Sequence, residues 1–218
     1  KQELLETLLH HPNTKSVIEY HDTWDIEWTL IAKDIKVFDK ILTSIFSRYA
    51  QIIIEKQHLV EVDYFYTTNL PYTFYKEMIK AHVEPTGESK LDKQDLAILR
   101  LLAKDARMNS VHIGREIGMS TDAVIERIKK LVNSGVITRF TVLTNRSVLD
   151  YRWYTVALQL KFLDQTNINK LKTFVQEHPY IIHCVRTFGS WDLLFTVCTE
   201  NSQHFHTTVK DIKRVFSH

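Results

Sequence analysis

The fold of this chain is decided by residues 91–138, LDKQDLAILRLLAKDARMNSVHIGREIGMSTDAVIERIKKLVNSGVIT. Leucines recur at helical spacing over 91–102, and Asp92 is a residue type that caps a helix N-terminus. A second, short helix is predicted over 111–117, with Ser110 as its cap. The stretch therefore begins with two helices separated by a short connection.

A turn and a third helix follow directly. Gly118 supplies the turn, Ser120 caps a helix over 121–133, and Gly135 ends it. Residues 136–142 alternate between apolar and polar side chains, as a strand does. Two short helices joined by a glycine turn, the second of them basic, are typical of a helix-turn-helix, here predicted to be winged.

The third predicted helix separates an apolar stripe from a polar face. The stripe consists of Val124, Ile128 and Leu131. The residues outside it are Thr121, Asp122, Glu126, Arg127, Lys129 and Lys130. Such a face could bind DNA, because arginine reads guanine edges and lysine attracts phosphates. A solvated charged face on an ordinary three-helix bundle is the alternative interpretation.

A repeat flanks this motif on both sides. His11-Pro12 aligns with His178-Pro179 at an offset of 167 residues (178 − 11), and Trp24-Asp25 aligns with Trp191-Asp192 at the same offset. Few positions are identical, so chance is the alternative explanation, but the apolar pattern agrees along the aligned segments.

Each copy predicts the same element order. A helix ends at His-Pro, and two strands and a second helix follow; the predicted ranges are 16–20, 25–32 and 35–48 in the first copy and 182–187, 192–199 and 203–214 in the second. A strand over 51–56 and an extended segment to Pro71 follow the first copy, while a strand over 153–162 and a helix over 168–177 precede the second. A complete unit would be β-α-β-β-α-β, the ferredoxin-like order. The first copy would lack its first strand and the second copy its last, so we expect more protein before Lys1.

The predicted class is therefore α+β, with a central winged helix-turn-helix between two incomplete ferredoxin-like domains. Its domains are a first copy at 1–75, a linker at 76–90, a DNA-binding domain at 91–150 and a second copy at 151–218. Acidic residues outnumber basic ones in the first copy, and basic residues predominate from 91 onward. The chain has no apolar stretch long enough to span a bilayer, which predicts a soluble cytoplasmic protein. The two cysteines, Cys184 and Cys198, lie in apolar runs and are expected to be buried free thiols.

The residues of the central motif resemble those of a known family. The matching residues run from Leu91-Asp92 through Asp105-Ala106-Arg107 and Ile117-Gly118-Met119-Ser120 to Gly135-Val136-Ile137. This pattern resembles the leucine-responsive regulators, also called the Lrp/AsnC or feast/famine family. The turn Phe188-Gly189-Ser190-Trp191-Asp192 is similar to the Gly-x-x-Asp turn of that family's ligand-sensing domain.

The resemblance implies a transcription regulator that binds double-stranded DNA, responds to an amino acid or similar small molecule, and forms homo-oligomers through its regulatory domains. It implies no enzymatic reaction, cofactor, metal or membrane partner. The implied DNA contacts are Arg107, Ser120, Thr121, Asp122, Arg127, Lys129 and Lys130, and the implied effector site is Gly189, Ser190, Trp191 and Asp192. Arg127 has an equal alternative as a structural residue, paired near Glu126 or with Asp105, and Arg107 could be a loop anchor.

The sequence departs from the family pattern because a sensing copy precedes the helix-turn-helix, which suggests a tandem fusion. Asp22 stands in the first copy where Gly189 stands in the second, so the first copy is expected to have lost ligand binding. It could instead serve as a built-in partner for the second copy.

Two rival functions remain open from the sequence. Siroheme decarboxylases share the architecture, and His183, Arg186, His204 and His206 cluster in the second copy. No pair of them has the spacing of metal ligands or of an acid and a base, so solvent-exposed polar side chains are the simpler interpretation. A scaffold whose helix-turn-helix only mediates assembly is the other. Steep salt dependence of DNA binding distinguishes a regulator from a scaffold.

Overall fold

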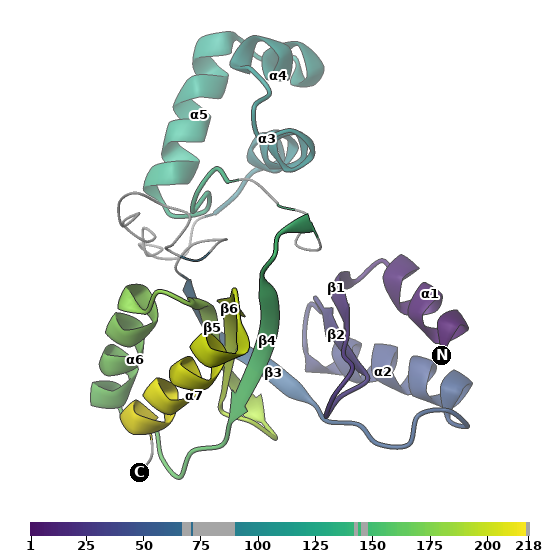
Figure 1. Cartoon of the computed structure of the whole chain (residues 1–218). Helices are drawn as coiled ribbons and strands as arrows, with labels where there is room; N and C mark the ends of the chain where they lie inside the picture. Colours follow the sequence, from purple (N-terminus) through teal and green to yellow (C-terminus); the bar gives the residue numbers. More distant parts are fainter. Residues whose placement is uncertain (67–70, 72–89, 142–143, 145–147, 217–218) are drawn as a thin grey trace. The chain divides into compact units, whose positions relative to one another are not determined.

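The computed structural model describes the chain except for residues 67–70, 72–89, 142–143, 145–147 and 217–218. It separates into two compact units, residues 1–58 and residues 59–218 (Figure 1). The predicted linker at 76–90 lies outside the described residues, apart from Lys90.

The first unit contains two helices and a two-stranded antiparallel sheet. The elements are α1 (Gln2–His10), β1 (Thr14–Glu19), β2 (Ile26–Leu30) and α2 (Ile35–Tyr49). Leu4 and Leu8 of α1 are buried together with Ile45 and Tyr49 of α2. The strand predicted over 51–56 is wrong, because a turn and backbone that belongs to no strand occupy that range. Its apolar residues do not form a buried strand, since Ile54 is fully exposed.

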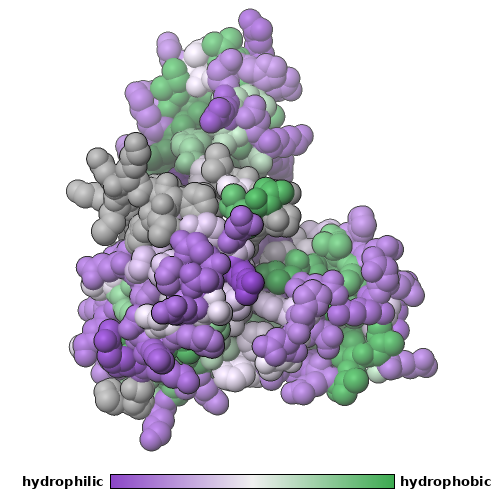
Figure 2. Space-filling view, in the orientation of Figure 1, coloured by the Kyte–Doolittle hydropathy of each residue, from purple (hydrophilic) through white to green (hydrophobic). Residues whose placement is uncertain are grey.

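The first unit also exposes large apolar side chains, including Ile31 and Ile35. Figure 2 shows apolar areas among the hydrophilic residues on the visible face of this unit. Exposed apolar surface of this kind is typical of a region that binds a partner.

Three helices form the predicted helix-turn-helix. They are α3 (Lys93–Lys104), α4 (Ser110–Ile117) and α5 (Thr121–Asn133). Ile98, Ile113, Val124 and Leu131 form their buried core. The cap of α4 is Asn109 and not Ser110, because Oδ1 of Asn109 accepts the N–H of His112 at 2.8 Å.

The predicted strand of the wing is not found. Residues 136–141 have no strand structure, and residue 142 lies outside the described residues. An alternating pattern alone does not make a strand; it also requires a neighbouring strand to pair with. The winged form of the prediction is therefore wrong over 136–141.

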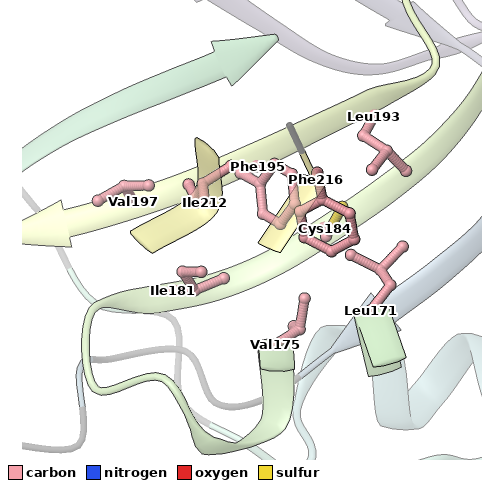
Figure 3. Packing of buried hydrophobic residues seen from close by; sticks show 9 residues of the cluster. All are labelled: Leu171, Val175, Ile181, Cys184, Leu193, Phe195, Val197, Ile212 and Phe216. Carbon is pink, nitrogen blue, oxygen red and sulfur yellow. The ribbon is translucent and has the colours of Figure 1, made fainter. Parts of the chain in front are cut away.

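The regulatory sheet has four strands in the order β3-β5-β6-β4, all antiparallel to their neighbours. The elements, in chain order, are β3 (Leu59–Tyr66), β4 (Arg152–Leu158), α6 (Gln165–Glu177), β5 (Ile181–Gly189), β6 (Leu193–Thr199) and α7 (Ser202–Phe216). Leu171 and Val175 of α6 and Ile212 of α7 pack on Leu193 and Phe195 of the sheet (Figure 3). Cys184 and Cys198 are buried free thiols, as predicted, and burial raises the pKa of Cys184 well above its usual value.

The repeat is visible in the hydrogen bonds, which recur at the same offset of 167 residues. In the hairpin turns, the N–H of Tyr20 donates to the carbonyl of Asp25 at 2.9 Å, and the N–H of Thr187 donates to the carbonyl of Asp192 at 2.9 Å. At each His-Pro turn the imidazole Nδ1 accepts the N–H two residues later, at 3.2 Å for both His11 and His178.

The buried positions recur as well. The equivalent pairs are Leu4 and Leu171, Leu8 and Val175, Ile45 and Ile212, and Tyr49 and Phe216. Because both hydrogen bonds and core positions agree, the two aligned segments have the same local fold.

Candidate DNA interface and effector turn

Helix α5 is the predicted recognition helix, and its start is fixed by a side-chain cap. Oγ of Ser120 accepts the N–H of Ala123 at 3.3 Å. Val124 and Leu131 face the domain core, and Asp122, Lys129 and Lys130 are exposed. Thr121 is half-buried beside the cap. These predicted residues therefore lie at the N-terminus of α5 and on its exposed face. Free N–H groups at the helix N-terminus can approach a phosphate.

Arg127 is held inside the domain by two carboxylates. Its Nη1 donates to Oδ2 of Asp92 and to Oδ1 of Asp95, at 2.7 Å each. Asp95 is only 1% exposed, and Arg127 is 28% exposed. We call Arg127, Asp92 and Asp95 the arginine clamp. It joins the middle of α5 to the start of α3.

The clamp is built on a capping box. Asp92 accepts the N–H of Asp95 at 2.8 Å, and Asp95 accepts the N–H of Asp92 at 3.2 Å. The N–H of Asp95 lowers the pKa of Asp92, and the Arg127 guanidinium lowers it further. Hydrogen bonds to Asp92 and Asp95 raise the pKa of Arg127 in turn. Asp92 and Arg127 therefore hold each other in their charged forms.

The structural partner of Arg127 is thus different from the partner predicted. Asp105 instead accepts the backbone N–H of Arg107 at 2.9 Å, and the Arg107 side chain is exposed at the loop before α4. The sequence identifies Asp92 only as a cap. The spacing of Asp92 and Asp95 is compatible with a capping box, but it carries no signal that Arg127 would reach them.

The remaining basic residues are available to solvent. Lys129 pairs with Glu126 at 2.9 Å, but both side chains are more than 60% exposed, so this pair contributes little to stability. Lys130 is exposed on the same helix. Arg115, in the last turn of α4, is exposed as well and was not singled out from the sequence. The helix-turn-helix therefore presents cations from both α4 and α5.

Two glycines set the approach of α4 to α5. Gly118 ends α4 with φ of +69°, a backbone conformation that favours glycine. Gly114 is buried within α4, and a Cβ built on it would lie 2.5 Å from the carbonyl oxygen of Met119. Gly118 is required by its backbone conformation, whereas Gly114 is required by the space around it.

Of the four predicted effector residues, Gly189 is the last residue of β5, and Ser190, Trp191 and Asp192 form the hairpin turn between β5 and β6. Gly189 has φ of +144°, and it is exposed together with Ser190, while Trp191 is half-buried. Oδ2 of Asp192 accepts the N–H of Leu160 at 2.6 Å, and the N–H of Asp192 donates to the carbonyl of Leu158 at 2.9 Å. Asp192 therefore fixes the turn against the end of β4, while Gly189 and Ser190 remain accessible.

The histidines and arginine considered for an enzyme have separate partners. Arg186 pairs with Asp63, His183 contacts Thr196 at 2.9 Å, and His204 pairs with Glu200 at 2.8 Å. Within the described ranges, no three or more His, Cys, Asp or Glu side chains are grouped so that they could hold a metal ion. Every described helix is too short or too polar to span a membrane.

The fold and the site define a helix-turn-helix protein with an attached α+β regulatory sheet. Residues 91–132 match the family described as AsnC-type helix-turn-helix domain, and residues 155–217 match the Lrp/AsnC ligand binding domain.

Curated relatives agree with both matches. The chain is 32% identical over 102 residues to the HTH-type transcriptional regulator Ptr1 of Methanocaldococcus jannaschii, covering 47% of this chain and 68% of that protein. It is 28% identical over 122 residues to the transcriptional regulator AzlB of Bacillus subtilis, covering 56% of this chain and 78% of that protein. The chain belongs to the Lrp/AsnC family, and it is a DNA-binding regulator with a ligand-binding domain.

Solved structures agree on the fold. The leucine response regulatory protein LrpA of Mycobacterium tuberculosis has a TM-score of 0.50 at 18% identity, covering 58% of this chain and 86% of that one. PH0061 has a TM-score of 0.52 at 16% identity, covering 59% of this chain and 86% of that one. Ptr1 and AzlB are both named as regulators, so they give no support to the siroheme decarboxylase alternative.

Proposed function

We propose that this regulator binds double-stranded DNA through α5 and that a small molecule of the amino-acid class, bound at the turn of Gly189, controls the binding. The observation that supports this most is that the basic residues of α5 have different surroundings. Arg127 holds the helix to the domain, and Lys129 and Lys130 are left at the surface. No catalytic step is part of the proposal.

Each DNA-facing residue has a separate proposed role. Lys129, Lys130, Arg107 and Arg115 neutralise phosphates, because exposed cations on the two helices and their entry loop suit the DNA backbone. The remaining predicted residues, Ser120, Thr121 and Asp122, lie at the helix N-terminus, where they approach base edges and phosphates. Arg127 acts through the position of α5 and not by touching DNA.

Replacing Lys129 and Lys130 together with alanine tests the phosphate role. We expect the plot of log K against log salt to become shallower by about 1 to 2, since each lost phosphate contact changes the slope by about 1. Fluorescence anisotropy with a labelled duplex from the gene's own upstream region measures it. The matched control is Lys210→Ala with Lys213→Ala, two lysines of α7, which should leave the slope unchanged. Equal slopes for wild type and the α5 variant would rule out these lysines as phosphate contacts.

The effector proposal rests on the accessible part of the turn. Gly189 has a backbone conformation that an L side chain rarely adopts, and Asp192 anchors the turn to the end of β4. Gly189 and Ser190 are therefore held in place and open to a ligand. In the first repeat the equivalent position is Asp22, and we propose that this repeat is a regulatory unit without its own ligand.

Replacing Gly189 with alanine should weaken effector binding at least tenfold, because the new side chain forces the turn out of its conformation. Isothermal titration with the twenty amino acids, first for wild type and then for the variant, measures the effect. Ser190→Ala is the control, since it keeps the backbone of the turn. An amino acid that binds wild type and the Gly189 variant equally well would place the effector site elsewhere.

We propose that this chain assembles through its regulatory units, as the match of residues 155–217 to the Lrp/AsnC ligand binding domain implies. The exposed apolar residues of the first unit support this, because such surfaces commonly bind a partner. The scaffold alternative differs in one observable property, since a protein interface does not require the steep salt dependence of phosphate contacts.

A further inference from the structure

Strand β3 belongs to the first repeat by its place in the chain. In the β-α-β-β-α-β order, the strand after the second helix is the last strand of the unit, and β3 is the strand that follows α2. Among the described residues, however, β1 pairs only with β2, and β3 pairs with β5 of the second repeat. The strand expected to complete one sheet extends the sheet of the other repeat instead.

The pairing of β3 with β5 is specific along its length. It runs from Leu59 opposite Gly189 to Tyr66 opposite His183. Phe65 lies opposite Cys184 and packs against the buried core of the regulatory sheet. The strand therefore contributes a side chain to the core as well as backbone pairing.

Polar and aromatic contacts hold the same register. Nε of Arg186 donates to Oδ2 of Asp63 at 2.7 Å, and Nη2 of Arg186 contacts the same oxygen. The rings of Tyr64 and His183 stack at 5.1 Å. A shift by one residue would turn Phe65 away from the core and separate Asp63 from Arg186. These contacts therefore favour β3, in this register, at the edge of β5.

We propose that the outer edge of β5 is a docking site for β3 of the same chain, so that the chain covers this edge of the regulatory sheet with its own strand. An uncovered edge of β5 would present free N–H and C=O groups to a strand of another molecule. Here the chain itself supplies the strand, with an aspartate opposite the one arginine of β5. The match to the Lrp/AsnC ligand binding domain begins at residue 155, so β3 comes from outside that domain.

The proposal rests on the proposed function only in treating both repeats as regulatory units. It differs from an assembly of two separate chains, because the partner strand at β5 comes from the same molecule. A second copy of the chain is the competing source of β3, and reversal of the Asp63–Arg186 pair distinguishes the two.

The first test compares Asp63→Arg, Arg186→Asp and the double variant by hydrogen–deuterium exchange of the full chain. Each single variant places like charges opposite each other, and we expect exchange in 59–66 and 181–189 to become roughly fivefold faster. The double variant restores the pair with reversed sign and should return exchange to the wild-type rate. Glu3→Arg, which breaks an exposed pair with Arg48 in the first unit, is the control and should leave both segments unchanged.

The second test separates one chain from two by co-expressing the two single variants. If β3 docks within its own chain, exchange stays fast, because each molecule still carries two like charges. If β3 comes from a second copy, the arginine introduced at position 63 of one chain faces the aspartate introduced at position 186 of the other. Wild-type exchange in the mixture would therefore overturn the proposal, as would unchanged exchange in the single variants. DNA binding by the wild-type protein is measured separately. The exchange rates can therefore be interpreted even if the proposed function fails.

Discussion

Arg127→Ala will lower both the stability of the helix-turn-helix and its affinity for DNA. The substitution leaves the buried carboxylate of Asp95 without its charged partner, which costs about 1 to 3 kcal/mol. Urea denaturation followed by circular dichroism measures the stability, and anisotropy with the labelled duplex measures the affinity. Helix α5 loses its connection to the start of α3, so DNA binding should fall even without urea, where the domain is still folded.

The matched control for Arg127 is Lys129→Ala, which removes an exposed cation from the same helix. Its ion pair with Glu126 is open to solvent, so the free energy of unfolding should shift by less than about 0.5 kcal/mol. If Arg127→Ala abolished DNA binding with no change in the unfolding midpoint, Arg127 would be a DNA contact. The arginine clamp would then not contribute to the stability of the domain.

Gly114→Ala will disrupt the helix-turn-helix through a steric conflict with backbone. The added Cβ would lie 2.5 Å from the carbonyl oxygen of Met119, directly before the Ser120 cap of α5. A backbone atom cannot move away by changing rotamer, so α4 and the turn must separate. We expect the variant to lose about 3 kcal/mol, the upper end of typical overpacking costs, and to bind DNA weakly because the two helices no longer meet at their native angle.

Gly118→Ala is the comparison for this prediction. Its Cβ would meet no atom within 4 Å, and only the positive φ of +69° opposes it. The expected cost is about 1 kcal/mol, with DNA affinity close to wild type. Equal unfolding midpoints for the Gly114 and Gly118 variants would contradict this prediction. They would show that the backbone at Met119 moves away from the new Cβ without loss of stability.

The local features of the DNA-binding domain could be predicted from the sequence because short-range chemistry determines them. Asp92 and Ser120 are capping residues in the structure, and Gly118 has the left-handed conformation expected of a turn glycine. The predicted cap of α4 lies one residue too late, because Asn109 and Ser110 can both cap and only the backbone geometry selects between them. Local signals therefore located each helix to within about two residues.

Contacts between distant segments could not be predicted in the same way. Arg127 meets Asp92 and Asp95 only because α5 packs against the start of α3, and nearer aspartates such as Asp105 were equally plausible from sequence. The sequence predicts an extended segment to Pro71, which contains β3, but it does not predict the strand with which β3 pairs. The apolar run around Ile52 is a stronger local indication of a strand than residues 59–66. Strand β3 nevertheless forms because it pairs with β5, more than a hundred residues later in the chain.

The repeat is the exception among long-range features, since a few identical residues and a matching apolar pattern indicate it in the sequence. His11 and His178 are equivalent because each imidazole accepts a backbone N–H at the same turn. What the alignment could not show is that the strand following the first repeat belongs to the sheet of the second. Sequence similarity reveals equivalent positions, whereas strand exchange depends on the energies of alternative pairings.

DNA recognition by α5 is tested most directly by the binding of the full chain to a labelled duplex from its own upstream region at several salt concentrations. We expect tight binding at low salt and a linear fall of log K with log salt, with a slope of about −0.9 for each phosphate contacted. No binding at low salt, or binding that does not change with salt, would contradict a DNA-reading α5.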